Sequence, residues 1–198
     1  METELRFASQ VTLFRKPSPH KIEVFMGKRK TRSFNGLLGT PGGNRDELDE
    51  KWQLFWEHIR KDVENPEPEE MGIEPSLVAA ARELRQEVGL IVPEVDRFKF
   101  LRRTTVESVV EAVKRVYRVD NFLLCAEGMD PKNTSPEEHG EMDWHDVDAV
   151  LTLHKHKLKN GGQGAVAGRF AETLLGLSKS QSEPPNRVVE KVRSSYAA

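Results

Sequence analysis

Two short stretches near the start of the chain show the hydrophobic pattern of strands. Apolar side chains dominate residues 7–15 and 22–26, and a proline-containing segment at 16–20 separates them. Apolar runs of this length, bounded by turn residues, are typical of β-strands. We therefore expect a strand pair, followed by a structured glycine-rich loop at 36–43.

Two later stretches repeat apolar residues every three or four positions, which is the period of an amphipathic helix. The first spans 48–63, carries Trp52 and Trp56 on its apolar stripe, and has acidic residues at its start. The second spans roughly 75–88 and is followed by Gly89, a residue suited to the left-handed position after a helix. The proline- and glutamate-rich run between them predicts a connector.

The remainder of the chain also alternates between strand and helix patterns. Residues 98–106 and 116–124 have the pattern of strands, 127–143 that of a polar loop, and the last helix is expected at about 164–177. Residues 179–198, which contain much serine, proline and charge, are expected to form a weakly packed tail. This succession indicates an α/β fold.

Composition narrows the class of protein. The chain has 198 residues, of which 37% are hydrophobic and 31% charged, the balance of one globular domain with a solvated surface. No apolar run reaches membrane-spanning length and the N-terminus resembles no export signal, so we expect a cytoplasmic protein, with the nucleus or an organelle left open. Cys125 is the only cysteine, which excludes an internal disulfide and a zinc site built from several thiolates.

Charge gives only a local signal. The net charge of −2 provides no overall attraction to nucleic acid, but a basic run extends from Lys28 to Arg32. This run is either a solvated hairpin end or a surface, including Lys28 and Arg32, that contacts the phosphates of a nucleotide or of RNA. Four histidines lack a recognised ligand spacing and are expected at the surface: His139, His145, His154 and His156.

The helix at 75–88 carries the clearest chemistry. Positions three and four apart share a helix face, so the side chains of Glu83, Gln86 and Glu87 converge. Two neighbouring carboxylates repel each other unless a cation lies between them, and oxygen ligands suit hard divalent cations such as Mg²⁺. Such an ion can neutralise a diphosphate and polarise a water molecule for attack on phosphorus. The pattern favours pyrophosphate hydrolysis.

This helix resembles the Nudix box of a family of hydrolases, G-x5-E-x7-R-E-U-x-E-E-x-G-U, where U is aliphatic. Gln86 departs from the usual glutamate, and the matching residues are Glu74, Arg82, Glu83, Leu84, Glu87, Gly89 and Leu90. The resemblance assigns catalysis to Arg82, Glu83 and Glu87. The two glutamates would bind the metal, the arginine would orient them, and Gln86 would occupy a ligand position.

The segment before the box also resembles the family. Thr40-Pro41-Gly42-Gly43 is similar to the approach to the box, but thirty residues instead of five separate it from Glu74. We infer an insertion at about 44–73, which contains the Trp52/Trp56 helix. The resemblance places Gly42 and Gly43 among the substrate-binding residues and adds Gly43 to the metal site.

A further glutamate is expected in a late loop. Members of the family carry one shortly before a tryptophan, where it completes the metal site or acts as a base. Glu141, three residues before Trp144, fits this habit and is assigned to both catalysis and the metal. Glu138 is the second choice.

The resemblance covers residues 6–153 and implies an α/β/α sandwich. A mixed central sheet would carry the Nudix helix on one face and the C-terminal helix on the other, within a single domain at 1–178. The implied activity is hydrolysis of the pyrophosphate bond in a nucleoside diphosphate linked to another moiety. The cofactor would be Mg²⁺ or Mn²⁺, and the substrate a small-molecule nucleotide.

Two alternatives stay open. Gln86 removes one negative charge facing the cation, which favours a Nudix-fold nucleotide- or RNA-binding protein with weakened catalysis. The basic run and the inserted helix favour an enzyme that acts on the 5′ end (cap) of RNA. Trp52 and Trp56 would then bind substrate by stacking on a base, although packing of the apolar stripe is the commoner reason for such aromatics. The sequence is silent on oligomeric state.

Overall fold

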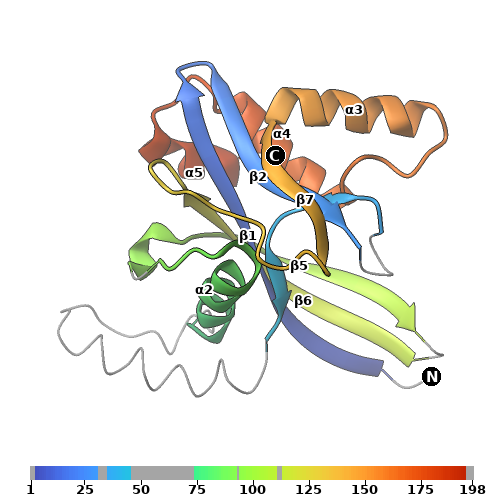
Figure 1. Ribbon diagram of the computed structural model, residues 1–198. Coiled ribbons are helices and arrows are strands. Elements are labelled where there is room, and N and C mark those ends of the chain that lie inside the picture. Colours follow the sequence, from blue (N-terminus) through green and yellow to red (C-terminus); the bar gives the residue numbers. More distant parts are fainter. Residues whose placement is uncertain (1–2, 31–34, 46–73, 93, 111–112, 195–198) are drawn as a thin grey trace.

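Among the residues that the structure describes, a mixed sheet of seven strands separates one helix from a layer of three helices (Figure 1). The computed structural model describes residues 3–30, 35–45, 74–92, 94–110 and 113–194. Its strands are β1 (Thr3–Ser18), β2 (Lys21–Arg29), β3 (Leu38–Gly39), β4 (Gly42–Asn44), β5 (Lys99–Val110), β6 (Val113–Cys125) and β7 (His139–Asp146). Its helices are α2 (Glu74–Val88), α3 (Val147–Lys159), α4 (Gly168–Lys179) and α5 (Pro185–Ser194), with a 3₁₀ turn at Val95–Arg97.

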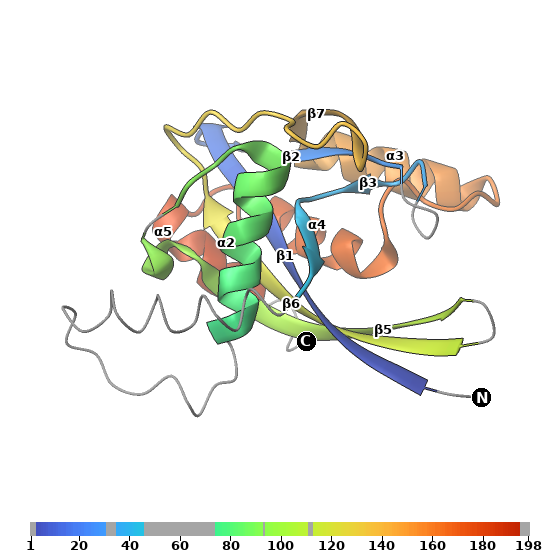
Figure 2. The same cartoon turned by 60° about the horizontal axis from the view of Figure 1, so that its bottom comes forward.

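The sheet is mixed because β1 and β6 run parallel, whereas the other strand pairs are antiparallel. The strand order is β3-β2-β1-β6-β5, with β4 also pairing with β1 and β7 with β2. β1, β5 and β6 project beyond the helices at one end (Figure 2). The β1–β2 pair confirms the strand pair expected at 7–26, and β5 and β6 run longer than the sequence pattern indicated.

Two hydrophobic clusters lie on opposite faces of the sheet. Each strand contributes alternate residues to them, since successive side chains of a strand point to opposite sides. Toward α3, α4 and α5 the cluster includes Phe14, Val24, Met26, Leu123, Leu151, Leu174 and Val192. Toward α2 it includes Leu13, Phe25, Ala80, Leu84, Val88, Phe122 and Met142. The expected α/β/α sandwich is therefore confirmed, with the box helix on one face and the C-terminal helices on the other.

Helix α2 ends where the sequence predicts. Gly89 has a φ of +67°, a left-handed conformation that glycine adopts without a steric penalty. The N–H of Gly89 donates to the oxygen of Arg85, and the N–H of Leu90 donates to that of Leu84, both at 3.2 Å. These bonds satisfy carbonyls that the helix end would leave unpaired.

The end of α2 is also tied to the loop that precedes β7. The N–H of Thr134 donates to the oxygen of Glu87 at 2.9 Å, and the hydroxyl of Thr134 donates to that of Gln86 at 2.6 Å. The N–H of Lys132 donates to the oxygen of Val88 at 3.0 Å. This loop is therefore held against the last turn of α2.

The C-terminal part differs from the expected weakly packed tail. Residues 185–194 form α5, and its Val188 and Val192 are fully buried in the cluster beneath α3 and α4. The ammonium of Lys16 donates to the backbone oxygen of Gln181 at 2.5 Å, which fixes the preceding turn to β1. The serine- and proline-rich composition masked a short amphipathic pattern.

Two other elements begin elsewhere than expected. The segment expected as a polar loop up to residue 143 becomes strand β7 at His139, because it pairs with the edge of β2. The helix expected from about 164 begins at Gly168, and Ala165 and Val166 before it contact β3 instead: the N–H of Leu38 donates to the oxygen of Ala165 at 2.9 Å, and Leu38 bridges Val166. The helix expected at 48–63 and the connector after it lie outside the described residues.

Within the part of the chain that the structure describes, no helix combines the length and the apolar character needed to span a membrane.

Candidate active site

Helix α2 presents two buried carboxylates to the sheet. Glu83 and Glu87 are one turn apart and therefore share a face of the helix. Leu84 and Val88 anchor the same helix in the hydrophobic cluster. The exposed fraction is 7% for Glu83 and 1% for Glu87, which is unusual for glutamates. Such burial needs compensating partners, because a desolvated charge is costly when it is left alone.

Strand β4 supplies the first partner through its backbone. The N–H of Gly42 donates to Oε2 of Glu87 at 2.7 Å. At Gly43 a Cβ atom would overlap Oε1 of Glu83, and at Gly42 it would overlap the backbone oxygen of Ser9. Only glycine therefore lets β4 pass between β1 and the two carboxylates.

Arg82 fixes the orientation of the outer carboxylate. Its Nη1 donates to Oε1 of Glu83 and to Oε1 of Gln86, both at 2.8 Å. Its Nη2 donates to the backbone oxygen of Asn44 at 2.8 Å, so the guanidinium connects α2 to β4. The resemblance to the Nudix box implies that Arg82 orients the glutamates, and this role stays a prediction.

The loop before β7 brings Glu138 and His139 to the same place. The Nε2 atom of His139 lies 3.2 Å from Oε1 of Glu87, and both side chains are inaccessible to solvent or nearly so. Partial burial raises the pKa of Glu138, and the charge of Glu87 and a hydrogen bond with it raise this pKa further. Glu138, the second choice of the sequence analysis, therefore lies in the carboxylate cluster.

The cluster carries more negative charge than its cations balance. Burial raises the pKa of Glu83 to about 7, the charges of Glu87 and Glu138 act in the same direction, and Arg82 opposes them. Carboxylates that share a low-dielectric site resist simultaneous ionisation unless a cation joins them. The arrangement suits a bound cation.

A model of the NUDIX domain matches residues 8–164, which is most of the chain. The chain belongs to the Nudix family. Its fold is similar to that of a NUDIX hydrolase from Alicyclobacillus acidocaldarius, with a TM-score of 0.71 at 16% identity over 96% of this chain and 97% of that one.

Weaker similarity extends to two other solved structures. The ORF135 protein of E. coli has a TM-score of 0.49 at 14% identity over 92% of this chain and 95% of that one. An Ap4A hydrolase of C. elegans has a TM-score of 0.48 at 12% identity over 97% and 98%. No curated protein matched the sequence.

Nudix hydrolases generally use divalent cations, and the donor set here has the right chemistry for one. Among the described residues, no group of three or more His, Cys, Asp and Glu side chains is arranged to hold a metal ion. Mg²⁺, however, is commonly bound by one or two carboxylates, with water and substrate phosphates completing its ligands. Glu83 and Glu87 could supply these carboxylates, because a carboxylate has about four lone pairs and hydrogen bonds use only some of them.

Gln86, the residue that departs from the Nudix box, lies outside the buried pair. It is exposed, and its side-chain oxygen accepts from Arg82. Its amide therefore extends the Arg82 network and leaves Glu83 and Glu87 in place.

Glu141 lies on the other side of β7. Met142 and Trp144 pack in the cluster beneath α2, so the intervening alternation directs Glu141 and Asp143 away from it. The charges acting on Glu83 include those of Glu87 and Glu138. The structure thus brings Glu138 to the Nudix helix and directs the first-choice glutamate elsewhere.

Arg29 is a member of the site that the sequence analysis did not select. The Nη2 atom of Arg29 donates to the backbone oxygens of Thr40 at 2.9 Å and Gly42 at 3.2 Å, and its charge acts on Glu138. Lys28, which was selected, points to the other face of β2. In the structure, β2 alternates, with Phe25 facing α2 and Met26 facing α3, and this places Arg29 and Lys28 on opposite faces.

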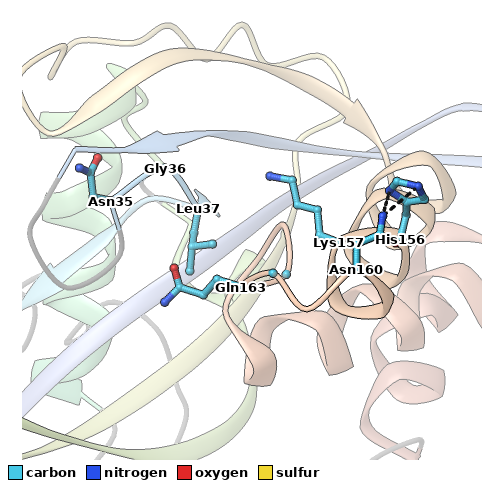
Figure 3. Close-up of a pocket in the computed structure, with 9 residues that line it drawn as sticks. Asn35, Gly36, Leu37, His156, Lys157, Asn160 and Gln163 are labelled. Carbon is cyan, nitrogen blue, oxygen red and sulfur yellow. Dashed lines mark hydrogen bonds between the residues drawn. The ribbon is translucent and has the colours of Figure 1, made fainter.

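Lys28 instead lines a groove on the α3 face. The groove has two lobes of about 490 and 260 Å³, which share Gly36 and Lys157. In the larger lobe Asn35, Leu37, Lys157 and Gln163 lie around the hollow (Figure 3). This groove is on the side of the sheet opposite the Nudix helix. The other proposed substrate contacts, Arg32, Trp52 and Trp56, lie outside the described residues.

Proposed function

We propose that this protein hydrolyses the pyrophosphate bond of a nucleoside diphosphate linked to another group, using Mg²⁺ or Mn²⁺. The observation that carries the proposal is the buried pair Glu83 and Glu87, one helical turn apart and held against the backbone of Gly42 and Gly43. A protein gains no stability from two adjacent buried carboxylates, so their presence favours a functional site.

Glu83 and Glu87 would hold the cation in this proposal. When bound, a divalent cation neutralises charge on the phosphates and polarises water for attack on phosphorus. Arg82 on α2 donates both to Glu83 and to the backbone of β4, which keeps Glu83 in place, and the N–H of Gly42 keeps Glu87 in place. The protein side of the site is therefore organised before substrate arrives, which is how enzymes avoid reorganisation during the reaction.

Glu138 is the base of this proposal. The pKa of Glu138 is raised toward neutral pH, and a general base is most effective when its pKa is close to the pH at which the enzyme works. Glu138 immediately precedes β7, on the loop that contacts the end of the Nudix helix, so it can take the proton of the attacking water. Arg29, whose charge acts on Glu138, provides positive charge beside the phosphates.

The alternative of a binding protein with weakened turnover is less favoured. Gln86 is exposed and bonded to Arg82, so its amide changes the rim of the site and leaves the buried pair intact. The hypothesis of an RNA 5′-end hydrolase depends on the basic run and the inserted tryptophans, and of these residues Arg32, Trp52 and Trp56 lie outside the described part of the chain. A substrate panel distinguishes all three.

The test measures nucleoside monophosphate release by chromatography from ADP-ribose, Ap4A, nucleotide sugars and capped RNA, with Mg²⁺, with Mn²⁺ and with EDTA. We expect metal-dependent release from a small nucleotide, reduced at least about 100-fold in Glu87→Gln. Glu190→Gln, an exposed glutamate on α5, is the matched control.

Two outcomes would contradict the proposal. In the first, the wild type is inert and the variant Gln86→Glu has turnover, which favours the hypothesis of a binding protein. The second is release from capped RNA alone, with affinity that falls steeply as salt rises, which favours the RNA enzyme.

A further inference from the structure

His139 is the most deeply buried polar neighbour of the carboxylate cluster. None of its surface is exposed, and its Nε2 atom lies 3.2 Å from Oε1 of Glu87. The other carboxylate oxygen, Oε2, accepts from the N–H of Gly42 at 2.7 Å. Both carboxylate oxygens of Glu87 therefore have a polar neighbour: the backbone of β4 at Oε2 and the imidazole of His139, at the start of β7, at Oε1.

A bulge in β7 turns His139 toward Glu87. Between the pairs Gly27–Met142 and Arg29–His139, β2 advances by two residues and β7 by three. The extra residue returns His139 to the face on which Met142 packs against α2. Without it, the alternation of β7 would direct the imidazole to the opposite side of the sheet.

The loop before β7 gives this position rigidity. The N–H of His139 donates to the oxygen of Ser135 at 3.1 Å, and the hydroxyl of Ser135 donates to the oxygen of Gln86 at 3.2 Å. The side chain of Asn133 closes the loop by donating to the oxygen of Gly140 at 2.6 Å. The imidazole is thus attached to the same helix turn that carries Glu87.

Packing alone does not account for a histidine here. Within the described residues, Nδ1 of His139 is buried and has no hydrogen-bond partner. A buried nitrogen without a partner loses its hydrogen bonds to water, and a leucine or phenylalanine of similar size would avoid that loss. The polar ring is therefore useful through its other nitrogen, which faces Glu87.

We infer that His139 is a positioning residue, which holds the Glu87 carboxylate in the orientation that binds the divalent cation. This inference rests on the proposed function, because it assigns Glu87 to the cation. With an amide at Gln86, the chain lacks one of the box carboxylates, so the site depends more on the correct placement of Glu87. Residues that orient a metal ligand commonly change metal affinity 10–100-fold when they are replaced.

The test compares His139→Leu with His139→Gln, since glutamine retains an N–H that can reach Glu87. The first readout is Mn²⁺ affinity of the metal-free protein, measured by electron paramagnetic resonance of the unbound ion. The second is the Mg²⁺ concentration that gives half-maximal turnover. We expect His139→Leu to weaken both about 10–100-fold, and His139→Gln to restore most of the loss.

His154 is the matched control. It is also buried, on the other face of the sheet, and its Nδ1 accepts from the N–H groups of Ala165 and Val166. His154→Leu should lower the unfolding temperature and leave Mn²⁺ affinity within about twofold of wild type, since it lies far from any proposed ligand.

The outcomes separate the two claims. Equal loss of Mn²⁺ affinity in the leucine variants of His139 and His154 would show a structural role only and overturn the inference, as would unchanged affinity in His139→Leu. A wild type that binds no Mn²⁺ and shows no metal-dependent turnover would instead overturn the proposed function itself. If His139→Leu does not fold, equal affinities of His139→Gln and His139→Ala would overturn the inference.

Discussion

The backbone N–H of Gly42 and the carboxylate of Glu87 are joined by a 2.7 Å hydrogen bond across 45 positions of sequence. A main-chain donor survives every substitution except proline, so the place of this carboxylate follows the path of β4. A side chain introduced at position 42 or 43 would therefore act on the site by displacing the backbone of β4. The close approach of β4 and α2 is therefore as important to the site as its acidic residues.

Gly43→Ala should damage the site directly. The added methyl group would overlap Oε1 of Glu83, and the neighbouring Arg82 contact to Asn44 leaves β4 little freedom to move away. We expect a loss of about 1–3 kcal/mol in the free energy of unfolding. We also expect kcat/KM to fall about 100-fold, because small displacements of catalytic groups have large effects. Chemical denaturation and steady-state kinetics measure the two effects.

Gly140→Ala provides the control for this substitution. Its Cβ would lie 3.5 Å from the nearest atom, the backbone oxygen of Lys28, which is an ordinary contact. If the two alanine variants lose the same stability and activity, the close fit between β4 and α2 has no special role.

Glu83→Gln should stabilise the metal-free protein while removing its activity. The amide keeps an oxygen that can accept from Arg82. It no longer repels Glu87 and Glu138, whose charges add to the effect of burial in raising the pKa of Glu83. We expect about 1 kcal/mol of added stability at pH 8. Thermal unfolding in EDTA checks this, and a lower unfolding temperature than wild type would argue against repulsion within the cluster.

The two loop glutamates should differ in their effect on turnover. Glu138→Gln removes a carboxylate that interacts with Glu87, whereas Glu141 points to the other side of β7. We expect kcat to fall about 100-fold in Glu138→Gln, the contribution of a general base, and to fall much less in Glu141→Gln. Glu137→Gln, an exposed neighbour, controls for the charge of the loop. A larger loss in Glu141→Gln would return the role of base to that residue.

Glu23 should make folding stability depend on pH. Burial raises the pKa of Glu23, but hydrogen bonds from Lys21 at 2.6 Å and Arg15 at 2.7 Å outweigh it, so the net pKa lies below the ordinary value of 4.5. The ion pairs therefore stabilise the fold above about pH 4.5, and their contribution is lost as the pH falls through the lowered pKa.

Glu23→Gln tests this dependence. Because Arg15 and Lys21 are partly exposed, the expected loss at pH 7 is about 0.5–1 kcal/mol. Denaturant titrations at pH 7 and pH 3 should show the variant approaching wild type at the lower pH. A constant difference between the two proteins would mean that the charge of Glu23 is not responsible.

The Nudix helix was predictable because its signals are local. The three- and four-residue spacing placed Glu83 and Glu87 on one face, and Gly89 marked the end of the helix. The strand pair at the start of the chain was predictable for the same reason. Each of these features depends on residues within a few positions of one another.

His139 and Arg29 could not be found by the same reasoning. The direction of His139 depends on a bulge in β7, which exists only when β7 pairs with β2. Arg29 lies in the basic run, but the sequence does not reveal which face of β2 meets α2, so it does not distinguish Arg29 from Lys28. Helix α5 was missed because its buried valines are few and lie in a polar segment.

The sheet that keeps the two hydrophobic clusters apart also separates the layer of α3, α4 and α5 from the face that carries Glu83 and Glu87. Among the described residues, the hydrophobic cluster that contains side chains of α3, α4 and α5 shares no residue with the cluster beneath α2. We expect that layer to tolerate substitutions that preserve its packing. Turnover should survive such changes, because the proposed catalytic residues lie on the opposite side of the same strands.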